Sequence, residues 1–392
     1  MESWLIRPGF VKAFHCIATD CEDSCCYNWS ITIDKQSYRK TCQHPELRVK
    51  ADSAMTKIKK DDTQWAVIKL RPDGGCPFLT DGDLCEIHAK GGHELLSHTC
   101  KTYPRLTRQQ GSDKYESLSL SCPEAARCVL FYPDAFSFER LPSGKHLNIA
   151  TIPSWQTQTH HHAISLLLNP ALSWEQALLA IGILTNTAET VKQRQADSNQ
   201  IEQIATQLEQ LIANDTLQQH FANFANDISH QEHAFVSTHK FLVTNAVNRG
   251  RQRFEQIHNA VLALTELPDG MNQLNKAWET VAKPALAEHP QLFHRYLFYY
   301  LYNMNFPVIE KLSPTDSFRL MVLDAFMLRC YLAALASSKG TLTQDDVVLC
   351  FQVYHTKRQH DKNFSRFITE LLDEAGFTDV GAMISLLHTQ YQ

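Results

Sequence analysis

Four cysteines within eleven residues, in the pattern C-x4-C-x3-C-C, constrain this chain more than any other stretch of its sequence. Ten of the twelve cysteines lie in the first third of the chain: Cys16, Cys21, Cys25, Cys26, Cys42, Cys76, Cys85, Cys100, Cys122 and Cys128. The remaining two, Cys330 and Cys350, stand in apolar helical surroundings and are expected to be ordinary buried thiols. The first third is therefore where cysteine chemistry is expected.

Thiols crowded in this way form disulfides, hold zinc or hold an iron–sulfur cluster. Disulfides need an oxidising compartment, which a protein normally reaches through a secretory signal. The N-terminal sequence Met-Glu-Ser-Trp-Leu-Ile-Arg-Pro-Gly-Phe has no apolar core of the signal-peptide kind, so we expect a cytoplasmic protein. In that compartment the cysteine pattern favours metal binding over disulfides.

Spacing alone does not separate zinc from an iron–sulfur cluster, because both take four deprotonated sulfurs. The two C-x2-C knuckles typical of structural zinc are missing from the sequence, and the thiols come from several separate segments, which favours the larger cluster. Neighbouring side chains diverge in a helix or a strand, so one residue of the Cys25-Cys26 pair is expected to ligate while the other packs or serves a second centre. The expected metal-ligating residues are Cys16, Cys21, Cys25, Cys26, Cys76, Cys85, Cys100 and Cys122. The plainer alternative is that some of them are small buried residues only.

Composition indicates a globular, mainly α-helical protein. The 392 residues carry a net charge of −5, which disfavours a nucleic-acid partner, and they include only 14 glycines. No apolar run reaches the roughly 18 residues of a transmembrane helix, so we expect no transmembrane segment.

The sequence predicts two domains, a cysteine-rich one over residues 1–140 and a helical bundle over 155–392, separated by a stretch with Pro142, Gly144 and Pro153. In the first, short strands are predicted at 29–33, 65–71 and 115–121, and a polar, helical stretch at 34–60. In the second, the capping patterns at Ser173, Ser313 and Thr343 each predict the start of a helix. The aromatic-rich segment 293–306 is predicted to be a core helix, with a pocket for a cationic group as the alternative.

The assembled motifs resemble the flagellin lysine N-methylase family. They are the C-x4-C-x3-C-C segment, Cys76-Pro-Phe-Leu, Cys85-Glu-Ile-His, Cys100-Lys-Thr-Tyr-Pro-Arg and Ser-Cys122-Pro-Glu. The resemblance covers the whole chain in length and layout, with its specific motifs in residues 10–125. It implies a methyltransferase that uses S-adenosylmethionine as co-substrate, modifies lysines of flagellin as its partner protein, and contains an iron–sulfur cluster, expected to be 4Fe–4S.

Methyl transfer by direct displacement needs a neutral lysine amine, and free lysine titrates near ~10.4. A general base or a desolvating pocket must supply that amine. The weak catalytic candidates near the cysteines are His98 and Tyr103, with the acids Asp20, Glu22 and Asp23, and Arg105 as a carboxylate-binding residue. For the acids, His98 and Tyr103 the favoured explanation is an ordinary solvated surface group or a residue that supports a cysteine sulfur. The alternative for Arg105 is that it simply bridges the two domains.

The sequence contains neither the glycine-rich G-x-G turn of familiar adenosylmethionine sites nor a C-x3-C-x2-C triad. The co-substrate is therefore expected at a site of another kind. The alternative to an enzyme is a zinc or iron–sulfur binding module without its own chemistry, acting as a carrier or scaffold.

Overall fold

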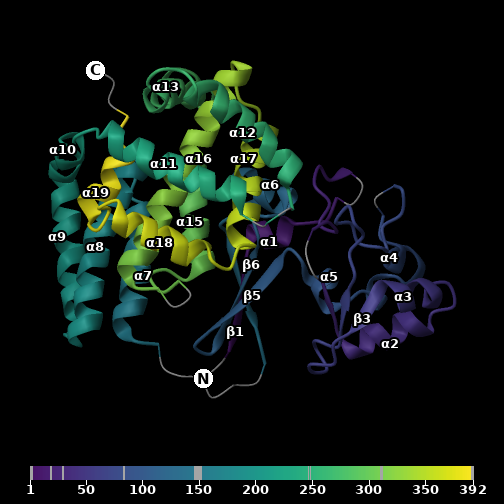
Figure 1. Ribbon diagram of the computed structural model, residues 1–392. Coiled ribbons are helices and arrows are strands. Elements are labelled where there is room, and N and C mark those ends of the chain that lie inside the picture. The colour runs from purple at the N-terminus through teal and green to yellow at the C-terminus, as the bar shows by residue number, and fades with distance from the viewer. Residues whose placement is uncertain are drawn as a thin grey trace.

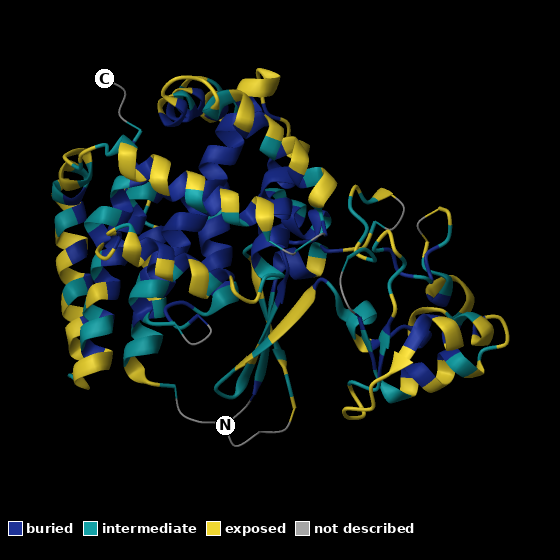
Figure 2. Cartoon of the chain, in the orientation of Figure 1, coloured by how far each residue is buried: buried dark blue, intermediate teal, exposed yellow. Residues whose placement is uncertain are grey.

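The computed structural model describes residues 3–17, 20–28, 31–82, 84–144, 152–245, 247, 249–309 and 312–389 (Figure 1). It is mainly helical with a few short strands, as the composition predicted. Two separate clusters of buried apolar side chains divide the described chain. We call the part around the larger cluster the helical body, and the part around the smaller one, residues 31–102, the cysteine-rich lobe (Figure 2).

The helical body is built around one almost completely buried helix, α16. It spans Pro314–Lys339 and packs against α8, α12, α13, η3 and α17. By length and composition α16 would suffice to cross a membrane, but 94% of its apolar stretch is buried inside the protein, which makes it a core helix here. The other helices from residue 154 onward are α7 (Ser154–Leu167), α8 (Trp174–Arg194), α9 (Asn199–Ala213), α10 (Thr216–Ala222), α11 (Ile228–Thr244), α12 (Arg251–Thr265), α13 (Gly270–Ala277), the π-helix η3 (Trp278–Ala282), α14 (Lys283–Ala285), α15 (Leu292–Met304), α17 (Gln344–Gln359), α18 (Phe364–Glu374) and α19 (Val380–Ser385).

The predicted helix starts are confirmed. The hydroxyl of Ser173 accepts from the backbone of Gln176 and completes a capping box at the start of α8. Ser313 caps α16 and Thr343 caps α17 in the same way, each accepting from the backbone three residues on. The predicted aromatic core helix is also present as α15, whose tyrosines are buried.

A four-stranded sheet lies against the helical body, in the order β5-β6-β1-β7. Its strands are β1 (Trp4–Pro8), β5 (Arg105–Gln110), β6 (Asp113–Leu118) and β7 (Phe138–Pro142), with β1 parallel to β6 and antiparallel to β7. Tyr299 and Tyr302 of α15 donate hydrogen bonds from their hydroxyls to the carbonyls of Leu118 and Glu116, which fixes the helix on the sheet. Helices α1 (Gly9–Ala13) and α6 (Pro123–Phe131) complete this region.

This packing distributes the first 140 residues over both parts of the molecule. Residues from α1, β6 and α6 belong to the buried cluster of the helical body. Of the first 140 residues, only those of the lobe form a separate core. Residues 145–151, within the predicted boundary between 140 and 155, lie outside the described residues. The division into 1–140 and 155–392 stays a prediction.

The cysteine-rich lobe contains a three-stranded antiparallel sheet in the order β2-β4-β3. Its elements are β2 (Thr32–Ile33), α2 (Lys35–Gln43), α3 (Arg48–Ala54), β3 (Met55–Lys57), β4 (Ala66–Ile68), α4 (Glu86–Gly91), the 3-10 helix η2 (His93–Leu95) and α5 (His98–Thr102). The prediction of a helical stretch to residue 60 is wrong at its end, because Met55 and Ile68 pair across β3 and β4 and are both buried. Of the strand predicted at 29–33, Trp29 and Ser30 lie outside the described residues.

Candidate functional site

A cavity of about 420 Å³ lies where the cysteine-rich lobe meets the helical body. We call it the cysteine-lined cavity. Seven of the eight cysteines expected to bind metal line it: Cys16, Cys21, Cys25, Cys26, Cys85, Cys100 and Cys122. The eighth, Cys76, is buried beside it, and its backbone nitrogen donates to the carbonyl of Cys26 at 2.9 Å. The structure therefore brings thiols from distant parts of the sequence to one place.

Local structure explains how the later cysteines reach the cavity. Cys85 and Cys122 stand directly before α4 and α6, each in extended backbone geometry at a helix start. Cys100 lies in the first turn of α5, where its backbone nitrogen donates to the Ser97 hydroxyl at 3.2 Å. Pro123 opens α6, a position at which the missing N–H costs nothing.

Burial controls the protonation of these thiols. It raises the pKa of Cys76 to about 11 and the pKa values of Cys100 and Cys122 to about 12. Cys25 is the exception, because a hydrogen bond from Cys26 lowers the pKa of its thiol to about 7. Most of these sulfurs thus stay protonated unless a cation compensates their charge, and a bound metal would release the protons.

Among the described residues, no three His, Cys, Asp or Glu side chains are arranged as ligands of a single metal ion. The metal role of the eight cysteines stays a prediction. The donor chemistry of the cavity wall suits a thiolate-bound group, since softer metals and iron–sulfur clusters take sulfur ligands.

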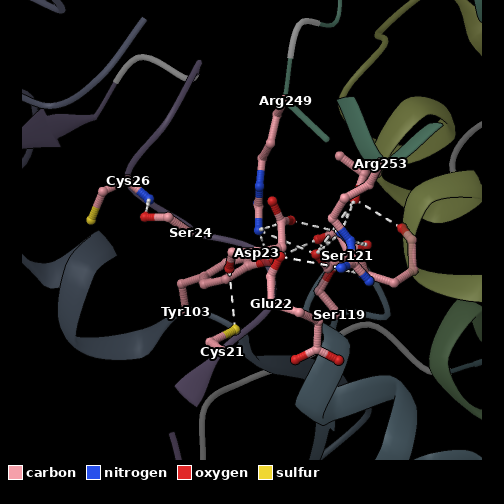
Figure 3. Close-up of polar contacts among 12 residues, drawn as sticks. Cys21, Glu22, Asp23, Ser24, Cys26, Tyr103, Ser119, Ser121, Arg249 and Arg253 are labelled. Atoms are coloured by element: carbon pink, nitrogen blue, oxygen red, sulfur yellow. Dashed lines mark hydrogen bonds and ion pairs between the residues drawn. The ribbon is translucent and has the colours of Figure 1, made fainter. Parts of the chain in front are cut away.

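A buried arginine joins the cysteine segment to the helical body (Figure 3). Arg249, next to the start of α12, lines the cavity with only 1% of its side chain exposed. Its Nη2 donates to Tyr103 Oη at 2.6 Å and to the carbonyl of Ser121 at 3.1 Å. The same nitrogen lies 3.9 Å from Asp23 Oδ2, and Asp23 also accepts from Gln352 of α17 at 2.7 Å. Asp23, between Cys21 and Cys25, is therefore tied to α17 and to the loop that precedes α12.

A second arginine, Arg127, also holds the same segment. Arg127 of α6 binds the carboxylates of Glu22 and Glu124 at 2.7 Å and that of Asp345 at 3.1 Å. Arg253 of α12 adds a hydrogen bond to the carbonyl of Glu22 at 3.2 Å. The loop that carries the densest cysteines is thus held by side chains from α6, α12 and α17.

The three weak catalytic candidates lie in different surroundings. Tyr103 lines the cavity, and burial raises the pKa of its phenol well above the usual range. Arg105 is exposed on β5, where it donates to the carbonyl of Phe14 at 3.1 Å and stacks over the Phe14 ring. His98 is exposed at the start of α5 and is not part of the cavity wall, whereas His88 of α4 is. Their catalytic roles stay predictions.

Arg249 and Gln352 are site residues that sequence reasoning missed. Arg249 stands in Asn-Arg-Gly-Arg, which is typical of any polar turn before a helix, and Gln352 is one polar residue in a long helix. Neither has a local pattern that would single it out.

Comparison with known proteins adds evidence of another kind. Residues 161–386 match the family model of the FliB lysine N-methylase C-terminal domain. The chain is 27% identical to the lysine-N-methylases of Salmonella choleraesuis and Salmonella typhimurium over 383 residues, which cover 94% of this chain and 96% of each relative. It is also 35% identical over 139 residues to the flagellar biosynthetic protein FliU of Salmonella muenchen, covering 35% of this chain and 82% of that protein. No solved structure shows significant similarity to the chain.

Proposed function

The chain belongs to the FliB lysine N-methylase family, and from this premise we propose that it methylates lysine side chains of flagellin with S-adenosylmethionine as the methyl donor. Two relatives named lysine-N-methylase, each aligned over nearly its whole length, support a lysine methyltransferase. The flagellar name of a third relative supports a flagellar protein as substrate. We place the reaction in the cytoplasm, where cysteines stay reduced.

The proposed reaction is a transfer of one methyl group to a nitrogen atom. The lone pair of the neutral lysine amine forms the new bond to the methyl carbon, the carbon–sulfur bond breaks, and its electron pair stays on the sulfur as a thioether. The amine nitrogen then loses a proton to a base or to water. Because free lysine is almost fully protonated at neutral pH, the enzyme must bind it where the neutral form is favoured.

We further propose that the cysteine-lined cavity holds an iron–sulfur cluster, of the 4Fe–4S type. The observation that carries this proposal is the convergence of Cys16, Cys21, Cys25, Cys26, Cys85, Cys100 and Cys122 around one cavity. Four of these would ligate the cluster. The bound cluster would either stabilise the fold or supply an electron to the reaction. The cation of Arg249 would offset the negative charge of the thiolates, since it lines the same cavity and itself contributes to lowering the pKa of Cys25.

The test compares the full chain purified without oxygen with two serine variants. Cys21→Ser removes a thiol of the cavity wall, and Cys42→Ser removes one from α2 that does not line the cavity. Iron, sulfide and zinc per chain are measured with methyl transfer to flagellin lysines, read by mass spectrometry. We expect iron and methylation to fall together in Cys21→Ser only.

Zinc in place of iron in the wild type would refute the cluster. A loaded wild-type protein that methylates no flagellin would refute the enzyme and favour a carrier or scaffold.

A further inference from the structure

A second cavity, of about 840 Å³, opens in the helical body and shares no lining residue with the cysteine-lined cavity. Its wall comes from the start of α8, the end of α10, η3, α14, the start of α15 and residues 387–389. Figure 1 shows α10 and α19 on the side of the body that faces away from the cysteine-rich lobe. Except for residues 387–389, this wall lies within the region that matches the methylase C-terminal domain.

Aromatic rings form the apolar part of this wall. Trp174 stacks on Phe293 with ring centroids 4.4 Å apart and an interplanar angle of 15°. Trp278 of η3 meets Phe293 edge-on at 5.8 Å. All three rings are buried and line the cavity, so they offer flat, rigid surfaces to a planar ligand or to a cation.

Two carboxyl groups line the same cavity, and their partners differ. Glu279 binds Lys283 at 3.1 Å and accepts from the Thr389 hydroxyl at 2.6 Å. Glu175, in the first turn of α8, forms no ion pair within 4.0 Å among the residues that the structure describes, and Arg329 and Lys283 act on its carboxyl group from farther away. Burial raises the pKa of Glu175. A cation in the cavity would add a closer positive charge than Arg329 and Lys283 supply, and would favour the ionised carboxylate.

The wall combines features that suit one kind of cation. A sulfonium carries a positive charge but has no N–H or O–H group that could donate a hydrogen bond. Aromatic faces and a nearby carboxylate can therefore recognise it without a set of hydrogen-bond acceptors. An ammonium group needs several acceptors to replace its water. Lys283, at the rim, could meet a carboxylate of the ligand, and the volume lies in the range of small-molecule sites, roughly 300–1,000 Å³.

We propose that this cavity is the methyl-donor cleft, in which S-adenosylmethionine binds with its sulfonium near Glu175 and the Trp174–Phe293 pair. The proposal rests on the proposed function and adds the place where the donor is held. It also agrees with the absence of a glycine-rich donor turn from the sequence.

The first test measures the affinity of the metal-loaded full chain for S-adenosylmethionine and for its neutral thioether product, S-adenosylhomocysteine, by calorimetry. Glu175→Gln removes the charge and keeps the shape, while Glu288→Gln is a control on an exposed residue that does not line the cleft. We expect Glu175→Gln to weaken donor binding about tenfold, in line with the loss of an interaction with a charged group, and to change product binding little. Glu288→Gln should bind both ligands as the wild type does. Equal effects of Glu175→Gln on both ligands, or no effect, would overturn the proposal.

The second test maps donor binding directly. The wild-type protein is irradiated with methyl-labelled S-adenosylmethionine, and the labelled peptide is identified by mass spectrometry. A label on 173–186 or 278–294 supports the cleft, and a label on 14–26 or 82–104 overturns it while leaving the proposed function intact. A wild-type chain that binds no donor at all would overturn both.

Discussion

Replacing Arg249 with methionine tests whether this arginine holds the cysteine segment on the helical body. The substitution keeps most of the apolar stem and removes the guanidinium, which donates to Tyr103 Oη and to the carbonyl of Ser121. Hydrogen bonds to charged groups contribute about 1.5–3 kcal/mol each. Both acceptors keep another partner, because Ser121 Oγ remains 3.1 Å from Tyr103 Oη and Gln352 still donates to the Ser121 carbonyl at 3.2 Å. The lower end of the range therefore applies, and the free energy of unfolding should fall by about 3 kcal/mol.

Urea unfolding followed by far-ultraviolet circular dichroism measures this change. Arg251→Met is the matched control, because Arg251 lies two residues away with 69% of its side chain exposed and a loose contact of 3.8 Å to Glu255. Such an exposed pair contributes at most about 1 kcal/mol. If Arg249→Met is no more destabilising than Arg251→Met, the buried network around Asp23 does not hold the two parts together in the way described.

Three further predictions concern other parts of the molecule. Cys25→Ser should lower iron per chain and methyl transfer together, while helicity by circular dichroism stays close to that of the wild type, because α7–α19 have a core that does not include Cys25. Arg358→Met should lower the free energy of unfolding by about 3–5 kcal/mol. Arg358 lies 2.7 Å from the fully buried carboxylate of Asp324, which would lose its counter-ion. Arg366→Met, a substitution of an exposed arginine, is the control in the same urea titration. Burial lowers the pKa of His239 to about 4, so the folded protein keeps this ring neutral. Below about pH 6.5 the unfolded chain binds a proton at this histidine and the folded protein does not. The free energy of unfolding should therefore fall as the pH drops from 6.5 toward 4, by up to about 1.4 kcal/mol per pH unit. Thermal unfolding of the wild type and of His239→Gln across this range checks the sign, and an equally steep loss of stability in the variant would contradict it.

Local patterns in the sequence were sufficient where the structure depends on neighbouring residues. The hydroxyls of Ser173, Ser313 and Thr343 each cap a helix whose first turn follows directly, so the capping energy and the pattern involve the same few residues. The convergence of the cysteines could also be anticipated, because a shared metal was the chemical reason for expecting it. The structure reproduces the convergence and leaves the metal to be tested.

Contacts between residues far apart in the sequence could not be predicted from local patterns. β1 pairs in parallel with β6 about a hundred residues later, and no pattern in Trp4–Pro8 specifies that partner. Arg249 reaches Tyr103 and Asp23 from a loop far along the chain, so its role depends on the finished fold. Glu175 appears in the sequence as an ordinary first-turn acid of α8, and only the fold shows that it lies in a cavity with two tryptophans.

The separation of the two cavities has a consequence for the chemistry. Direct displacement requires the amine nitrogen and the methyl carbon to lie about 3–3.5 Å apart before reaction, so the lysine must enter whichever cavity holds the donor. If the donor binds beside Glu175, the transfer takes place in the helical body, and the cysteine-lined cavity acts through folding or through placement of the substrate protein. Electron transfer from a cluster to the donor would instead require the donor to bind next to the cysteines. The two sets of lining residues do not overlap, so the position of the photolabel distinguishes one cavity from the other. A label beside Glu175 would favour displacement over radical chemistry, whereas a label beside the cysteines would be compatible with both.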